Sequence, residues 1–274
     1  MSIEELIIFG KQYLHKSEVE LIVAFYLDKN PLELLLYLDN IIEPETASKI
    51  KDAIERRSKN EPLSYILGEV NFCGYPFHVD SRALIPRFET EELVMETVSF
   101  IKKYMQDGIR IIDLGCGSGV IGITLHKLLP NSNVTLVDIS EDALSLAREN
   151  ASLLDENVTI LQSDMLDNVQ GLFDVIVSNP PYVKLDDEVA LDVLEYEPHL
   201  ALFAEEDGLY FYRRILEKVP FVTNEHYLLA FEIGPDLKED IIGLIESKLQ
   251  DVTIISRDDM SGRNRMIFVM HNLE

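Results

Sequence analysis

The sequence predicts an α/β domain with a mostly parallel sheet, preceded by a small bundle of helices. From residue 109 onward, short apolar runs alternate with longer segments of helical periodicity, which is typical of a parallel sheet. Before residue 60, apolar residues recur at mixed three- and four-residue spacings, which is typical of amphipathic helices. The chain has 274 residues, enough for one large domain and one small one.

The N-terminal part is expected to contain four or five helices. Ser17 is a candidate N-cap with Glu20 completing a capping box, and Pro31 and Pro44 suit first-turn positions. The apolar spacing places helices over residues 3–14, 18–27, 32–38 and 44–58.

Residues 70–79 form two short extended runs around a glycine-containing turn, which predicts a β-hairpin. A further helix is expected to follow this hairpin and to run to about Tyr104. We therefore expect an N-terminal helical domain over residues 1–68, a hairpin linker over 69–87 and the α/β domain over 88–274.

The α/β domain has a simple expected order. Strands are predicted over residues 110–114, 134–138, 159–162, 174–178 and 228–233, and helices over 119–129, 141–153, 209–219 and 236–249. Two successive strands, 252–256 and 266–270, predict an antiparallel hairpin joined to the edge of the sheet.

The composition limits the partners that the protein can bind. The net charge is −25, and residues 1–60, with 8 basic and 11 acidic side chains, contribute only −3 of it. The remaining −22 would repel nucleic-acid backbones and favour the approach of a basic protein, although acidity also serves solubility alone. We expect no direct nucleic-acid partner.

The cysteine and apolar content predicts a cytoplasmic protein. Two cysteines, Cys73 and Cys116, provide no disulfide framework, and no His/Cys cluster has metal-ligand spacing. No apolar stretch reaches membrane-spanning length, and the acidic N-terminus lacks a signal peptide's basic region.

A glycine-rich loop follows the first predicted strand of the sheet. It reads Gly115-Cys116-Gly117-Ser118-Gly119, and its glycines allow a sharp turn and close approach of a ligand. The Gly-x-Gly-x-Gly spacing differs from the dinucleotide-binding pattern, although Gly122 keeps that alternative open.

Two aspartates follow the next two strands. Asp138 is placed to accept hydrogen bonds from both ribose hydroxyls, or to stabilise the helix that begins at Glu141. Asp164 is a candidate acceptor from an adenine amino group, with Met165 packing on the ring, but an ordinary strand-end aspartate explains it nearly as well. S-adenosylmethionine fits these features best, because it needs a ribose anchor and an adenine slot but no phosphate cradle.

The tetrapeptide Asn179-Pro180-Pro181-Tyr182 ends a buried strand. The Asn179 side-chain oxygen and the Pro180 carbonyl can accept both protons of one planar NH2 group, while Tyr182 covers its face. Alternatively, the tetrapeptide is only a proline-rich turn that follows a buried strand. Downstream of the glycine loop, the tetrapeptide indicates methyl transfer to a planar nitrogen.

With these motifs, the chain resembles the HemK/PrmC family, the N5-glutamine methyltransferases of peptide chain release factors. The resemblance also rests on the segments Pro62–Gly68, Phe72–Val79, Leu84–Glu91, Glu197–Leu202 and Gly262–Arg265. It implies a Rossmann-like S-adenosylmethionine-dependent methyltransferase fold and methylation of the glutamine in the Gly-Gly-Gln loop of release factors.

The resemblance also implies roles for individual residues. Asn179, Pro180, Pro181 and Tyr182 would bind the substrate glutamine, and Thr90 would lie beside the cofactor. Cofactor contacts are implied for Gly115 to Gly119, Asp138, Asp164, Met165 and Asn179.

Some positions remain open within this resemblance. Phe88 stands where proline is expected, which would alter loop stiffness or add an aromatic wall. Glu197, Arg263 and Arg265 face the partner or are ordinary turn and edge residues.

Two other functions compete with glutamine methylation. An N6-adenine nucleic-acid methyltransferase would use the same two acceptors, but its base-flipping channel needs positive charge. A non-catalytic cofactor-binding regulator would not require both motifs intact. The helical domain either recognises the release factor or serves as a lid or stability element.

Overall fold

The structure is a computed structural model that describes residues 1–273. These residues form two compact units: residues 1–69 with 190–196, and residues 70–189 with the chain from 197 onward. Each unit has its own hydrophobic core. Within residues 1–273, no helix combines the length and the apolarity needed to cross a membrane.

The first unit is helical, as predicted. Leu6, Ile22 and Ile50 are fully buried in its core and come from three different helices, each of which contributes one apolar face. Pro31 and Pro44 occupy first-turn positions, as expected. The elements are α1 (Ile3–Gly10), α2 (Lys16–Tyr26), the 3₁₀ helix η1 (Pro31–Leu36), α3 (Pro44–Arg57), α4 (Leu63–Leu67) and α8 (Leu191–Tyr196).

Two local predictions in this unit were wrong. Ser17 is not the N-cap of α2, because the His15 side chain caps that helix by accepting from the Ser17 backbone N–H. The capping box lies instead at α1, between Ser2 and Glu5. The segment expected as a helix over residues 32–38 is the 3₁₀ helix η1, in which only Leu34 is buried, so no wide apolar face supports a longer helix.

The predicted hairpin is present. Strands β1 (Glu69–Phe72) and β2 (Tyr75–His78) are joined by Cys73 and Gly74, both with positive φ, as a tight two-residue turn requires. Phe72 and Phe77 meet edge to face and are fully buried in the core of the second unit.

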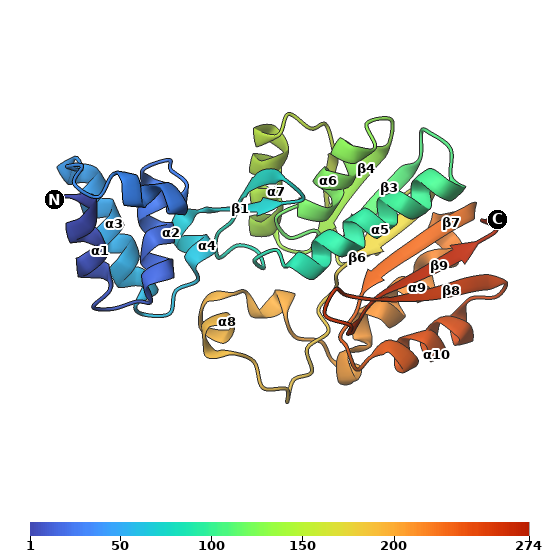
Figure 1. Ribbon diagram of the computed structural model, residues 1–274. Helices are drawn as coiled ribbons and strands as arrows, with labels where there is room; N and C mark the ends of the chain where they lie inside the picture. Colours follow the sequence, from blue (N-terminus) through green and yellow to red (C-terminus); the bar gives the residue numbers. More distant parts are fainter. Residues whose placement is uncertain (274) are drawn as a thin grey trace. The chain divides into compact units, whose positions relative to one another are not determined.

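The second unit is built around one mixed sheet with the strand order β5-β4-β3-β6-β7-β9-β8 (Figure 1). The first five strands in this order are parallel. Strand β9 is antiparallel to both of its neighbours, β7 and β8, as the terminal hairpin predicts. Their bounds are β3 (Arg110–Leu114), β4 (Asn133–Asp138), β5 (Thr159–Gln162), β6 (Phe173–Ser178), β7 (Thr223–Glu232), β8 (Val252–Asp258) and β9 (Asn264–His271).

Helices cover both faces of this sheet (Figure 1). One face packs against α5 (Phe88–Tyr104), α6 (Val120–Leu128) and α7 (Glu141–Leu153). The other face packs against α9 (Tyr210–Val222) and α10 (Lys238–Lys248). In β6, Val175 and Val177 face one layer and Ile176 faces the other, so the strand reads as a continuous apolar run.

The boundary between α9 and β7 differs from the expectation. The helix continues to Val222 across Pro220, and the strand begins at once at Thr223. Val219 and Val222 are both buried on the apolar face of α9, and this packing maintains the helix although proline removes one backbone donor.

The strand order indicates the edge of the sheet at which a ligand would bind. Successive strands run from β3 outward to β5, and β6 then returns to the other side of β3. In open α/β sheets, ligands bind at the carboxyl ends of the strands on either side of such a reversal. The glycine loop follows β3 and Asn179 follows β6, so both motifs lie at this position.

Candidate active site

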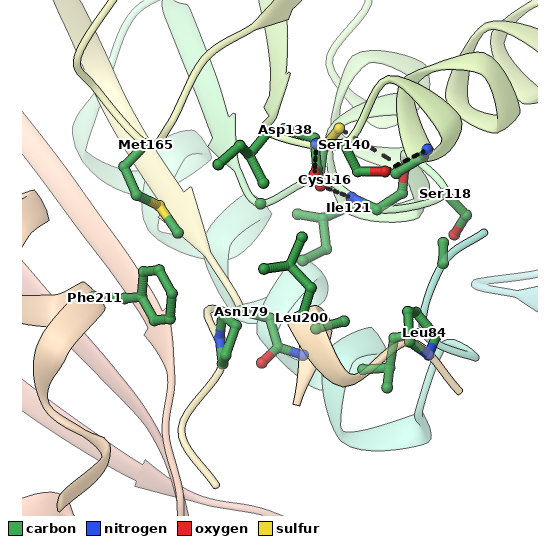
Figure 2. Close-up of a pocket in the computed structure, with 18 of the residues that line it drawn as sticks. Leu84, Cys116, Ser118, Ile121, Asp138, Ser140, Met165, Asn179, Leu200 and Phe211 are labelled. Atoms are coloured by element: carbon green, nitrogen blue, oxygen red, sulfur yellow. Dashed lines mark hydrogen bonds between the residues drawn. The ribbon is translucent and has the colours of Figure 1, made fainter. Parts of the chain in front are cut away.

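A cavity of about 290 Å³ opens at this edge of the second unit (Figure 2). Its walls come from the glycine loop, the ends of β4 and β6 and the segments 82–90, 163–165, 198–201 and 210–214. Of the predicted site residues, ten line it: Thr90, Gly115, Cys116, Gly117, Ser118, Asp138, Asp164, Met165, Asn179 and Pro181. Gly119, Pro180 and Tyr182 are not among the lining residues.

The glycine loop is fixed to the neighbouring strand. The backbone N–H groups of Gly115 and Cys116 both donate to the Val137 carbonyl, at 2.8 and 2.9 Å. Gly115 and Gly117 have positive φ, and a Cβ at either would meet nothing closer than 3.7 Å, so the loop presents bare backbone. Gly119 differs, because a Cβ there would lie 2.8 Å from Ile123 Cδ1. Gly119 is therefore required for packing rather than for ligand approach.

Asp138 is held by the backbone at the end of β4. Its carboxylate accepts from the N–H of Gly117 at 2.9 Å and from the N–H of Ser140 at 2.9 Å. Burial raises the pKa of this carboxyl, while hydrogen bonds from Ser140, Gly117 and Ile139 oppose the rise. Each oxygen still has a lone pair available, so Asp138 can accept two further hydrogen bonds from a diol.

Two other titratable groups surround the loop. Asp113 is fully buried and accepts from the Gly122 N–H at 2.9 Å, and burial raises its pKa to about 7. Burial also raises the pKa of the Cys116 thiol far above its ordinary value, so Cys116 is a neutral thiol. Cys116 therefore serves as an apolar wall and not as a nucleophile.

The adenine-side candidates include an ion pair that the sequence did not reveal. Arg214 of α9 donates to Asp164 at 2.7 Å and to Asp167 at 2.8 Å. Met165 and Phe211 point into the same space and supply apolar faces for a planar ring (Figure 2). Arg214 lines the cavity, so Asp164 presents a carboxylate that is already partly neutralised.

Asn179 is connected to a buried acid. Its Nδ2 donates to Thr90 Oγ1 at 3.3 Å, and that hydroxyl donates to Glu232 Oε2 at 2.7 Å. Glu232 is 2% exposed, and burial raises its pKa to about 7. An acidic residue inside an apolar strand was the only sequence signal for Glu232.

Tyr182 does not line the cavity and is held by a buried arginine. Its hydroxyl accepts from Arg265 Nη1 at 3.2 Å, and Arg265 also contacts Asp259 at 3.5 Å. Burial raises the pKa of Tyr182, so the phenol is neutral. Arg265 is buried, which makes it an internal support for Tyr182 rather than a residue facing a partner.

Glu197 joins two walls of the cavity. Its buried carboxylate accepts from the Ile85 backbone N–H at 3.0 Å and from Arg87 Nη2 at 2.6 Å. Glu197 is therefore an internal clamp. Phe88 begins α5 with its side chain 78% exposed and does not line the cavity, and Arg263 is exposed.

The donor set of this cavity fits S-adenosylmethionine. Asp138 offers acceptors for a diol, the loop offers bare backbone, and Ile139, Met165 and Phe211 offer apolar faces for a base. No group of His, Cys, Asp and Glu in residues 1–273 has the arrangement of a metal site.

Comparisons with known proteins agree with this arrangement. Residues 90–196 match the model of the methyltransferase small domain, and residues 7–68 match that of the PrmC N-terminal domain. The release factor glutamine methyltransferase of Lactococcus lactis is 36% identical over 254 residues, covering 92% of this chain and 93% of that protein. The one from Bacteroides thetaiotaomicron is 41% identical over 254 residues, covering 90% and 89%.

Solved structures show the fold. A methyltransferase from Pyrococcus furiosus superposes with a TM-score of 0.53 at 20% identity, covering 72% of this chain and 89% of that one. A 16S rRNA methyltransferase from T. thermophilus, in complex with AdoMet and guanosine, superposes with a TM-score of 0.55 at 16% identity, covering 74% and 50%. The near full-length identity to the curated relatives, together with both domain matches, shows that this chain belongs to the family of release factor glutamine methyltransferases.

Proposed function

We propose that this chain transfers a methyl group from S-adenosylmethionine to the side-chain amide nitrogen of the glutamine in the Gly-Gly-Gln loop of peptide chain release factors. The observation that supports the proposal is that Asp138, the candidate ribose acceptor, and Asn179, the candidate amide acceptor, line the same cavity. Family membership supports the same reaction.

The cofactor end of the cavity supports the first half of this proposal. Asp138 would bind the ribose hydroxyls, and the apolar faces of Ile139, Met165 and Phe211 would enclose the adenine. When bound, S-adenosylmethionine supplies a methyl group on a positively charged sulfur, which is a strong electrophile. The fold relative solved with AdoMet supports this choice of cofactor.

The amide end supports the second half. An amide nitrogen is a weak nucleophile because its lone pair is delocalised into the carbonyl. Hydrogen bonds from its two protons to Asn179 Oδ1 and to the Pro180 carbonyl would orient the nitrogen and stabilise the positive charge that develops on it. Asn179 does not have to gain or lose a proton in this role. The substrate nitrogen would release one of its own protons after it has been methylated, when it is acidic.

The test is transfer of labelled methyl from S-adenosylmethionine to a purified release factor. The matched control is the same factor with its Gly-Gly-Gln glutamine changed to alanine, and a short DNA duplex is the third substrate. Label on the intact factor alone supports the proposal. Label on the DNA would favour an adenine methyltransferase, and cofactor binding without any label would favour a regulator.

We also propose that the N-terminal helical domain recognises release-factor surface away from the glutamine. One side chain offers little specificity, so a second contact is needed. The 3₁₀ helix η1 carries apolar side chains that the first unit leaves exposed, with Leu32 at 83% and Leu36 at 77%. Contiguous exposed apolar surface marks protein interaction sites, and these leucines are the candidates for such a surface on the first unit.

Substitution of both exposed leucines in the full chain tests this proposal. Leu32→Ser with Leu36→Ser is expected to raise KM for the release factor about tenfold or more, with cofactor Kd unchanged. The matched control is Leu153→Ser with Leu172→Ser, two exposed leucines of the second unit that do not line the cavity. Equal KM for the η1 variant and the unmodified chain would contradict the proposal.

We also propose the cytoplasm as the compartment of this reaction. Both cysteines are free, which suits a reducing environment.

A further inference from the structure

Glu232 is a buried carboxylate to which the proposed function assigns no role. It is the last residue of β7, the strand beside β6, and Ser178 pairs with Phe231 in this register. Asn179 and Glu232 therefore leave the sheet side by side at the carboxyl edge. The Glu232 carbonyl accepts from the Tyr212 hydroxyl at 2.7 Å, which fixes the backbone from which the carboxylate projects.

The hydrogen bonds around Glu232 allow one arrangement when it is ionised. An ionised carboxylate only accepts, so the single proton of Thr90 must go to Glu232. The Thr90 oxygen then only accepts from Asn179, which must present its NH2 group to it. Asn179 Oδ1 is the atom left over, and it is the acceptor that a substrate amide requires.

We propose that Glu232 is a positioning residue for methyl transfer: acting through Thr90, it holds the Asn179 amide with Oδ1 available to the substrate nitrogen. This inference rests on the proposed function, because it assigns Asn179 the role of acceptor for the glutamine amide. Thr90 is then the link between a carboxylate and the amide, in addition to lining the cavity.

Protonation of Glu232 removes this constraint. A neutral carboxyl can donate to the Thr90 hydroxyl, which can then donate to Asn179 Oδ1. This favours the opposite orientation of the Asn179 amide, in which Oδ1 faces Thr90 and is not available to the substrate. Burial raises the pKa of Glu232 to about 7, Glu89 adds to the rise, and Thr90, Arg265 and Asn179 oppose it. Burial raises the pKa values of Tyr182 and Tyr212 above the ordinary value of a tyrosine, so both phenols are neutral near pH 7. Activity should therefore rise with pH through the pKa of Glu232.

The experiment compares the full chain with Glu232→Gln, using the release factor as substrate. For the unmodified chain, kcat/KM is expected to rise about tenfold per pH unit below about pH 7 and to level off above it. Glu232→Gln keeps the shape of the side chain but cannot ionise. It is expected to show a flat profile, about tenfold or more below the unmodified chain at about pH 8, with cofactor Kd within about twofold.

Three variants complete the comparison. Thr90→Ser keeps the hydroxyl and should retain the pH-dependent rise, whereas Thr90→Val should lose it. Glu225→Gln is the matched control, an exposed glutamate on the same strand, and should behave like the unmodified chain. An unchanged pH profile in Glu232→Gln or in Thr90→Val would overturn the inference.

A second readout separates this inference from the proposed function. The ¹⁵N side-chain amide resonance of Asn179, assigned by its loss in Asn179→Ala, should shift with pH near 7 in the unmodified chain and not in Glu232→Gln. This titration needs no substrate. Absence of glutamine methylation by the unmodified chain would contradict the proposed function, whereas an Asn179 resonance that does not titrate would overturn the role of Glu232.

Discussion

Asp138 and Glu232 are both carboxylates at the carboxyl edge of the same sheet, and the chain holds them in different ways. Asp138 accepts from the backbone N–H groups of Gly117 and Ser140. Glu232 accepts from the hydroxyl of Thr90, which in turn contacts the Asn179 amide. Backbone donors cannot rotate or be replaced, whereas a hydroxyl and an amide can exchange donor and acceptor roles. The Asp138 end of the cavity is therefore fixed by loop geometry, while the arrangement that we propose at Asn179 depends on whether Glu232 carries a proton.

The largest expected effect of a substitution is at the amide end. Asn179→Ala removes one of the two proposed acceptors and should lower kcat by about 10²–10³-fold, as removal of a transition-state hydrogen bond does in other enzymes. Cofactor Kd, measured by calorimetry, should change by less than about threefold. A kcat within about tenfold of the unmodified chain would show that Asn179 is not the acceptor.

The next effect is at the cofactor end. Asp138→Ala removes a charged acceptor for two hydroxyls and should raise cofactor Kd about 10²-fold, since hydrogen bonds to charged groups contribute about 1.5–3 kcal/mol each. Asp142→Ala, an exposed aspartate in the first turn of α7, is the control. Under saturating cofactor, KM for the release factor should stay the same. If Kd were unchanged, Asp138 would serve the helix N-terminus instead.

The buried acid should also make stability depend on pH. The pKa of Glu232 is about 7 in the folded chain and 4.5 in the reference state, so its neutral form is favoured by folding. The contribution of Glu232 to the free energy of unfolding is fully present below about pH 4.5 and is lost as pH rises through about 7. The loss approaches about 3 kcal/mol, because one pKa unit corresponds to about 1.4 kcal/mol.

Thermal unfolding of the unmodified chain and Glu232→Gln checks this expectation. The Tm difference between them should grow by several degrees in favour of the variant from about pH 5 to about pH 8. Burial also raises the pKa of Asp113 to about 7, so Asp113 lowers the stability of the folded chain over the same pH range. This loss of stability occurs equally in the unmodified chain and in Glu232→Gln, and it cancels in the Tm difference. A Tm difference that does not vary with pH would mean that Glu232 does not titrate in this range.

The smallest effects distinguish two glycines of the same loop. Gly119→Ala combines a positive φ with a Cβ 2.8 Å from Ile123 Cδ1, and should lower the free energy of unfolding by about 1–3 kcal/mol. Gly117→Ala carries the positive φ, but its Cβ meets only Ala83, at 3.7 Å. It should cost less stability and instead weaken cofactor binding. Equal Tm values for the two variants would contradict the packing role of Gly119.

Most of the fold could be predicted because its signals are local. The bounds of β3, β5 and α7 agree with the prediction, since short apolar runs mark the strands and Ser140 caps α7 by accepting from the Ala143 N–H. The errors had two causes. The apolar face of α9 is buried, and the helix continues through Pro220. His15 rather than Ser17 caps α2 through an equally local contact, which the spacing did not distinguish.

The sequence by itself determined the strand-loop-helix units and therefore placed the glycine loop, Asp138 and Asn179 at strand ends. Only the tertiary structure decided which side chains meet there. Thr90 reaches Glu232 across 142 positions of sequence, Ile85 reaches Glu197 across 112, and Arg214 reaches Asp164 across 50. Such contacts depend on strand order and on how α5 and α9 pack on the sheet, and neither leaves a periodic signal in the chain. A hydrogen bond requires an atomic position, and periodicity specifies only a face.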